Sequence, residues 1–413
     1  MPLIRPFAGL RPSPEFADKV VAPPYDVLNS EEARERVEGR PWSFLHVSKA
    51  EIDLPPGTDP YDAAVYAKSA ENFSHMLAEG VMVQDEKPYY YAYRLIMGEH
   101  VQTGIVAAAS VEAYDANRIR KHEFTRPAKE DDRVHQIEAL GAQTGPVFLV
   151  YPAHDVVDDI LTKVAEGEPD LDVVADGDVR HILWLVRSYE QTQQLNRAFA
   201  AMDSLYVADG HHRSAAASRV AASYKAANPA HTGEEAYNYF LTVIFPHDQM
   251  HILDYNRVVT DLNGLTELEF LALLDEAFIV DEAAAPVRPG RPAEFGMYLG
   301  GNWYALTLRP ELAIQSDPVA RLDVSLLASN LIEPILGISD PRRDARIDFI
   351  GGIRGLNGLE KRVDSGEMKV AFSLFPTRMQ DLMAVADKDE VMPPKSTWFE
   401  PKLADGIVSH MLD

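Results

Sequence analysis

The stretch Leu205-Tyr206-Val207-Ala208-Asp209-Gly210-His211-His212-Arg213-Ser214-Ala215-Ala216-Ala217 joins a short apolar run to an alanine-rich run through a glycine. Residues 204–208 are typical of a buried strand, and residues 214–227 predict a helix. A strand, a tight glycine turn and a helix start bring free backbone N–H groups and the positive end of a helix dipole to one place. The stretch therefore predicts a strand–turn–helix unit with an anion-binding turn.

The side chains of this turn suit phosphate chemistry. Asp209 lies at the end of the strand, where it can act as a general base or hold a metal ion. Gly210 allows the turn, and His211, His212 and Arg213 add donors, of which the planar guanidinium grips phosphate with two hydrogen bonds. The alternative is an aspartate helix cap with surface histidines. A cap explains Asp209 and Gly210 but does not require His-His-Arg.

Strands and helices alternate on both sides of this unit. A helix is predicted at 60–79 and a hairpin at 89–97 and 104–111, followed by strands and helices in turn at 146–151, 156–165, 181–186, 189–202 and 238–245. This order predicts an α/β (α+β) fold with a mixed-sheet core. We divide the chain into a proline-rich wrapping region with a helix (1–85), a catalytic core (86–260) and a C-terminal α/β region (261–413).

The charge balance restricts the kind of partner. The 413 residues include 39 Lys and Arg against 64 Asp and Glu, a formal net charge of −25. Such a chain is a poor binder of nucleic acid or of anionic membranes, because like charges repel. Any phosphate chemistry must therefore rest on a small local cluster of basic residues. The absence of cysteine excludes thiol nucleophiles and Cys-based metal centres.

Residues 118–133 form such a basic cluster, interleaved with carboxylates. The candidates for binding phosphate or substrate are Lys121, His122, Arg126 and Arg133. Glu130 is the alternative base to Asp209, and the tentative ligands of a Mg²⁺ ion are Glu123, Asp131 and Asp132. The alternative is a solvated, salt-bridged helix that begins at Pro127.

A third candidate lies near the C-terminus. Lys395, Ser396, Thr397 and Lys402 could extend the same anion site, or belong to a terminal strand that docks through its aromatic neighbours. The sequence contains no GxxxxGK[ST], GxSxG or HExxH motif. A nucleotide donor would therefore need an unusual site, whereas pyrophosphate needs only the anion cluster.

Six motifs in order resemble a large prokaryotic family that carries the label of a conserved domain of unknown function. They cover nearly the whole chain, at residues 6–12, 22–27, 44–47, 121–125, 208–213 and 392–397. The Asp209 to Arg213 box alone also resembles the phosphate-binding box of the ParB/sulfiredoxin superfamily, which includes free-serine kinases. Members of the first family are often encoded beside enzymes of serine biosynthesis.

The resemblance implies a kinase that makes O-phosphoserine from free L-serine, with Mg²⁺ and with pyrophosphate or a nucleotide as donor. It also implies a ParB/sulfiredoxin-like catalytic core. Because the sequence shows neither a signal-like N-terminus nor a run of 18 apolar residues, we expect a cytoplasmic protein. One alternative is a phosphatase or hydrolase of a small phosphorylated metabolite, in which water replaces the serine hydroxyl. Another is a non-enzymatic ParB-like regulatory protein. We expect a small-molecule substrate and neither nucleic acid nor membrane as a partner, and a homo-oligomer is compatible with the sequence.

Overall fold

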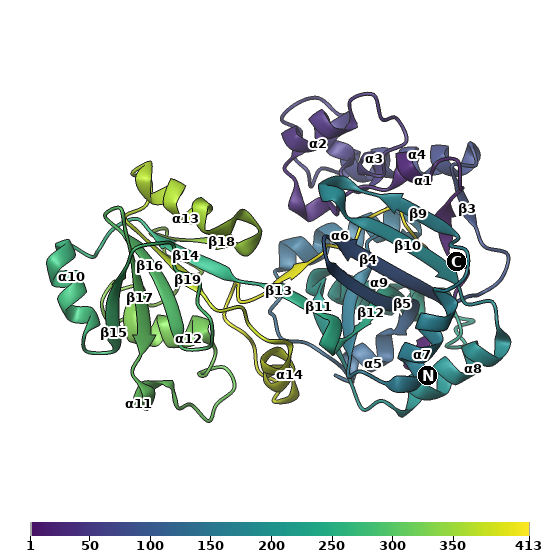
Figure 1. Ribbon diagram of the computed structural model, residues 1–413. Helices are drawn as coiled ribbons and strands as arrows, with labels where there is room; N and C mark the ends of the chain where they lie inside the picture. Colours follow the sequence, from purple (N-terminus) through teal and green to yellow (C-terminus); the bar gives the residue numbers. More distant parts are fainter. Residues whose placement is uncertain (1, 413) are drawn as a thin grey trace. The chain divides into compact units, whose positions relative to one another are not determined.

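The computed structural model describes residues 2–412, which form two compact units (Figure 1). Unit 1 comprises the chain up to Met250 together with the segment from Pro401 onward, and unit 2 comprises His251–Glu400. The three regions derived from the sequence have boundaries after 85 and 260, so they differ from these units. The difference arises because the N-terminal region and the C-terminal segment both pack with the core that follows residue 86.

Unit 1 is built on a nine-stranded mixed sheet. Its strand order is β6-β11-β8-β12-β5-β4-β10-β9, with β1 beside β5. The strands are β1 (Ile4–Arg5), β4 (Tyr91–Met97), β5 (His100–Ser110), β6 (Ile119–Arg120), β8 (Val147–Tyr151), β9 (Leu171–Val174), β10 (Arg180–Leu185), β11 (Leu205–Asp209) and β12 (Tyr239–Pro246). β12 runs parallel to β8 and β6 parallel to β11, while the other pairs are antiparallel. The predicted mixed-sheet α/β fold is confirmed.

Helices pack on this sheet and on one another. They are α1 (Ala17–Val20), α2 (Ser30–Val37), α3 (Leu45–Ser48), α4 (Ala63–Ala78), α5 (Val111–Asp115), α6 (Pro127–Leu140), α7 (Asp155–Val164), α8 (Tyr189–Ala201) and α9 (His211–Ala227). Two small sheets add β2 (Leu10–Pro12) with β3 (Met82–Gln84), and β7 (Ala142–Gln143) with β21 (His410–Met411). Every residue of β12 is buried, as its continuous apolar run predicts for a central strand. α6 packs against both α9 and α4.

The predicted helix at 60–79 begins three residues later than expected. Asp62, and not Asp59, caps α4, because its carboxylate accepts the backbone N–H of Ala64 at 2.8 Å. Asp59 instead accepts the N–H of Tyr61 at 3.0 Å and forms a turn before the helix. The other end agrees with the prediction, since Gly80 follows α4 with a φ of +68°.

Unit 2 has an antiparallel six-stranded sheet of order β15-β17-β16-β19-β14-β18. Its strands are β14 (Tyr255–Val259), β15 (Phe278–Ala283), β16 (Glu294–Leu299), β17 (Asn302–Leu308), β18 (Ile347–Gly351) and β19 (Val370–Leu374), and its helices are α10 (Glu267–Leu274), α11 (Pro310–Ala313), α12 (Asp323–Leu327), α13 (Gly355–Asp364) and α14 (Met379–Asp387). At its two chain ends, β13 (His251–Leu253) pairs with β20 (Trp398–Glu400).

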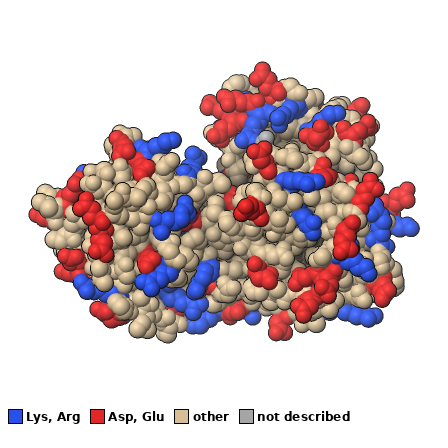
Figure 2. All heavy atoms as spheres, in the orientation of Figure 1, with Lys and Arg blue, Asp and Glu red and all other residues tan. Residues whose placement is uncertain are grey.

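Acidic side chains are spread over the face of the molecule shown in Figure 2, with Lys and Arg interspersed among them. This distribution agrees with the net charge of −25. Among residues 2–412, none of the helices combines the length and the apolar character that a bilayer-crossing segment needs.

Buried histidines in unit 1 make its stability depend on pH. Burial lowers the pKa of His122, His181 and His410 to about 4 each. The unfolded chain takes up these protons near its ordinary pKa of about 6.5, whereas the folded chain stays neutral down to about 4. Acidification through this window therefore destabilises the fold by about 1.4 kcal/mol per pH unit for each such histidine. Burial raises the pKa of Asp405 to about 7, so the folded state binds this proton at a higher pH than the unfolded state does. Acidification therefore stabilises the fold through Asp405, which offsets the destabilising effect of one histidine.

We expect the free energy of unfolding of this protein to fall steadily between pH values of about 6.5 and 4. Urea denaturation at several pH values measures it. His181→Gln should reduce the slope, because it removes one of the histidines that the unfolded chain protonates first. Gln can still accept a hydrogen bond from the hydroxyl of Tyr93, which lies 2.6 Å from Nδ1 of His181, so the variant should fold. A stability that is flat over this window would contradict the prediction.

Candidate functional site

The predicted strand–turn–helix unit is present and opens the candidate site. β11 ends at Asp209, Gly210 adopts a φ of +96°, and α9 begins at His211. The helix starts three residues before the predicted Ser214, because the left-handed conformation of Gly210 turns the chain within one residue. Consequently His211, His212 and Arg213 lie in the first turn of α9, beside its unpaired N–H groups.

Asp209 is held between two cations. Its Oδ2 accepts from Nζ of Lys402 at 3.2 Å, and its Oδ1 lies 3.8 Å from Nη2 of Arg213. Burial alone would raise the pKa of Asp209, but Lys402 and Arg213 outweigh burial and hold it well below its usual range. Asp209 is therefore a carboxylate, able to accept a hydrogen bond, throughout the neutral pH range.

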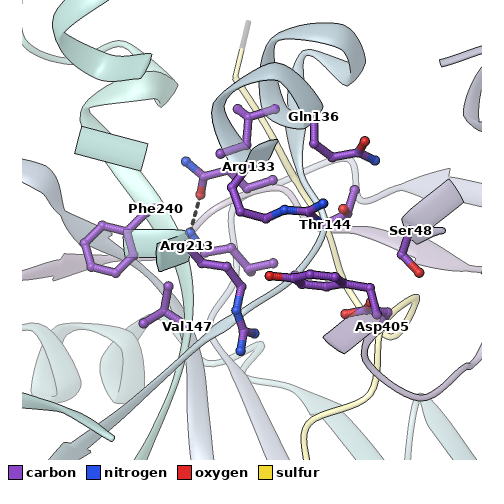
Figure 3. Close-up of a pocket in the computed structure, with 13 residues that line it drawn as sticks. Ser48, Arg133, Gln136, Thr144, Val147, Arg213, Phe240 and Asp405 are labelled. Carbon is purple, nitrogen blue, oxygen red and sulfur yellow. Dashed lines mark hydrogen bonds between the residues drawn. The ribbon is translucent and has the colours of Figure 1, made fainter. Parts of the chain in front are cut away.

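Two arginines line one small cavity (Figure 3). Arg213, from α9, donates through Nη1 to the carbonyl of Pro146. Arg133, from α6, binds the carboxylate of Asp132 through Nε and Nη2, at 3.0 and 2.8 Å, and its guanidinium lies 3.9 Å from the centre of the Tyr25 ring. Both side chains are nearly buried, 13% exposed for Arg133 and 11% for Arg213. Burial of two guanidinium groups is costly and favours a site that receives an anion.

The cavity is of a size to take one polar group of a substrate. Its volume is about 30 Å³, room for roughly two water molecules. The polar residues around it, besides the two arginines, are Tyr25, Ser48, Gln136, Gln143, Thr144 and Asp405. Burial, the largest influence, raises the pKa of Asp405 to about 7, and the charge of Asp26 acts in the same direction. Arg213 and Arg133 act in the opposite direction but do not outweigh burial. The cavity thus combines two fixed cations with one carboxyl group.

Three of the predicted histidines connect the basic cluster to the turn. The rings of His122 and His211 meet edge to face, with centroids 4.5 Å apart, and Nε2 of His211 accepts the backbone N–H of His122 at 3.5 Å. Burial, reinforced by His122, lowers the pKa of His211 well below its ordinary value, so the ring is neutral. His212 accepts the backbone N–H of Arg126 at 3.0 Å, which fixes the start of α6 against α9.

Other members of the basic cluster have structural partners. Glu130 accepts from the hydroxyl of Thr125 and lies 3.3 Å from Arg219 of α9. Its carboxylate thus joins α6 to α9, and its alternative role as the base stays a prediction. Lys121 donates to the carbonyl of Tyr114 at 3.1 Å and lies over its ring.

The three predicted metal ligands are not brought together. Asp132 is buried against Arg133 and Tyr66, Asp131 pairs with Arg219 at 2.7 Å, and Glu123 lies 3.8 Å from His211. Across residues 2–412 there is no group of three His, Asp or Glu side chains suited to hold a metal ion. Asp131 and Asp132 diverge because adjacent positions on α6 point to different neighbours. Mg²⁺ often binds through one or two carboxylates and substrate phosphates, so its presence remains a prediction.

Lys395, Ser396 and Thr397 belong to unit 2, and the hydrogen bonds described for this segment are made within unit 2. Arg257 donates to the carbonyl of Lys395 at 3.1 Å, and the hydroxyl of Ser396 donates to the carbonyl of Pro393 at 2.6 Å. Thr377 donates to the carbonyl of Ser396 at 2.8 Å. These bonds order the loop, and the part that it plays in anion binding stays a prediction.

Sequence reasoning missed Asp405 and Thr144, and it favoured a turn or packing role for Tyr25. Asp405 has a signal in hindsight, since it is a lone carboxylate within the apolar run Leu403 to Val408. A charged residue in such a run is buried only with a reason. Tyr25 lies in the motif at residues 22–27, whereas Thr144 has no comparable signal, because threonine is common in turns.

Comparison with known families gives one match that covers most of the chain. The family model described as "Protein of unknown function (DUF1015)" matches residues 4–325. The chain therefore belongs to the DUF1015 family, as the ordered motifs predict. In the comparison with curated proteins, none matches this chain.

Solved structures give weaker likenesses. A free serine kinase variant in complex with AMP is 14% identical, with a TM-score of 0.35 over 71% of this chain and 87% of the other. SbnI from Staphylococcus aureus, with a C-terminal truncation, is 13% identical, with a TM-score of 0.37 over 73% and 85%. A conserved hypothetical protein from Pyrococcus furiosus is 13% identical, with a TM-score of 0.34 over 75% and 96%. At these scores the likenesses carry no argument about function.

Proposed function

We propose that the protein is a phosphotransferase that phosphorylates the hydroxyl group of free L-serine. One observation carries the proposal: Arg133 and Arg213 line one cavity, and Arg213 also lies 3.8 Å from the carboxylate of Asp209 at the turn that opens α9. Phosphoryl transfer needs mainly positive groups around the phosphate and a group that orients the attacking hydroxyl. In a chain of net charge −25, two nearly buried guanidinium groups at one place meet the first need.

Asp209 meets the second need. As a carboxylate, it accepts a hydrogen bond from the serine hydroxyl and aligns its oxygen for attack. The serine oxygen forms the new bond to phosphorus, the bond from phosphorus to the leaving oxygen breaks, and the hydroxyl proton passes to Asp209. Arg213 and the N–H groups of the first turn of α9 stabilise the negative charge on the transferred group.

The donor is a polyphosphate, either pyrophosphate or a nucleotide. Pyrophosphate is the simpler choice, because it needs only the basic groups of the site and no pocket for a base. The resemblance of the Asp209 to Arg213 box to that of free-serine kinases supports the same reaction. Mg²⁺, held by the donor's phosphates and one carboxylate, would neutralise charge on the donor.

The test is incubation of the purified protein with L-serine and Mg²⁺, with pyrophosphate, ADP or ATP as separate donors. Mass spectrometry and ³¹P NMR would detect O-phosphoserine. We expect product with one donor and none when L-alanine, which lacks the hydroxyl, replaces serine. Phosphate release from O-phosphoserine, with no product from any donor, would instead establish a hydrolase. Tight, salt-sensitive binding of duplex DNA without turnover would establish a regulatory protein.

A further inference from the structure

The C-terminal segment from Pro401 to Leu412 is built into unit 1. β21 pairs with β7, Ser409 bridges to Leu10 and Asp405 bridges to Ala22, and the N–H of Leu412 donates to the carbonyl of Gly141 at 3.0 Å. Nearly all of its residues are buried. The segment lies outside residues 4–325, which the family model matches. Its backbone is therefore fixed along its length, and its side chains have defined positions.

Lys402, the second residue of this segment, reaches the candidate site. Its Nζ donates to Oδ2 of Asp209 at 3.2 Å, across 193 positions of sequence. Arg213 approaches the other oxygen, Oδ1, at 3.8 Å. Two cations on different oxygens of one carboxylate fix the rotation of its plane as well as its charge. A hydroxyl group oriented by Asp209 would depend on that rotation.

We propose that Lys402 is a positioning residue of the active site, which holds the carboxylate of Asp209 in the orientation that aligns the substrate hydroxyl. The proposal rests on the phosphotransferase function proposed above. It also implies that the C-terminal segment, which supplies Asp405 to the cavity as well, completes a site whose remaining residues lie within the part of the chain that the family model matches. The effect of Lys402 on the charge of Asp209 agrees with this role, since Lys402 is the strongest of the influences that lower the pKa of Asp209.

A merely structural ion pair predicts a different behaviour. Partly exposed pairs of this kind contribute little to stability, and their loss leaves the chemistry unchanged. The side chains of Lys402 and Asp209 are 25% and 33% exposed, so small molecules can reach the pair. That access allows the role of the ammonium group to be tested by chemical rescue.

The experiment compares wild type, Lys402→Ala and Lys402→Arg in O-phosphoserine formation. We expect kcat to fall about 10- to 100-fold in Lys402→Ala with little change in KM for the donor, as for loss of an orienting group. Lys402→Arg should recover much of kcat, and added ethylammonium should partly rescue Lys402→Ala. Lys163→Ala, on an exposed face of α7, is the matched control and should behave as wild type.

Two outcomes would overturn the proposal. Unchanged kcat in Lys402→Ala makes the pair structural only, and a raised KM for the donor with unchanged kcat assigns Lys402 to donor binding. A second measurement does not depend on turnover: the carboxyl ¹³C resonance of Asp209, identified with Asp209→Asn, should titrate at a higher pH in Lys402→Ala than in wild type. If wild type makes no O-phosphoserine, the proposed function fails, while this titration still decides whether Lys402 controls Asp209.

Discussion

Arg213→Ala should lower kcat/KM for O-phosphoserine formation at least about 100-fold, the usual effect of removing one donor that stabilises transition-state charge. Arg213 lines the cavity and lies 3.8 Å from Asp209. Its guanidinium, fixed through its bond to the carbonyl of Pro146, supplies a planar pair of donors to a phosphoryl group. Arg213→Lys keeps a point charge but not the planar pair, so it should recover only part of the activity.

Steady-state kinetics with a saturating donor measure this effect. Circular dichroism and Tm show whether the variant is folded, because Arg213 also helps to fill the space between Gly145 and Gly210. Arg197→Ala, an exposed arginine on α8, is the matched control. Wild-type activity in folded Arg213→Ala would refute the assigned site.

Asp209→Asn should reduce kcat by about 100- to 10,000-fold, the range for loss of a positioned acid–base group. The amide keeps the size of the side chain but removes its negative charge, so it attracts the proton of the substrate hydroxyl only weakly. Because Lys402 and Arg213 hold the pKa of Asp209 well below its usual range, against the effect of burial, wild type should show no loss of activity from this residue down to a pH of about 5.

The linked effect on stability has a definite sign. A carboxyl whose pKa is lower in the folded state stabilises the fold above its unfolded pKa of about 3.9, and this contribution is lost as pH falls below that value. Asp209→Asn should therefore be less stable than wild type at neutral pH and closer to it in strong acid. A folded variant with wild-type kcat would show that Asp209 is not the orienting group.

Local features of the site could be predicted from sequence where one residue determines the geometry. Gly210 and the apolar run before it predicted the turn between β11 and α9. The start of α9 was placed three residues late, because helix propensity favours the alanines and says little about His211 to Arg213. The first turn of a helix is decided by its cap and its tertiary contacts.

Long-range features of the site could not be predicted in the same way. The sequence singled out Lys402 as a candidate for the anion site but not its partner, because its approach to Asp209 depends on the return of the chain after 150 residues of unit 2. The separation of the three predicted metal ligands has a related reason. Glu123, Asp131 and Asp132 are near in sequence, but each finds a different partner once α6 packs against α4 and α9.

Unit 2 is an insertion within unit 1, and its two ends are joined by the pairing of β13 with β20. The register sets His251 opposite Glu400, and paired residues of antiparallel strands have Cα atoms about 5 Å apart. The chain therefore leaves unit 1 and returns to it at neighbouring points, and a few glycines between Met250 and Pro401 could close the gap at little entropic cost. A variant without residues 251–400 should fold, as a cooperative thermal transition would show, and should keep the Lys402–Asp209 pair. An aggregated product would contradict this expectation. With its two chain ends paired in this way, unit 2 can be lengthened, exchanged or removed without a change in the strand register of unit 1.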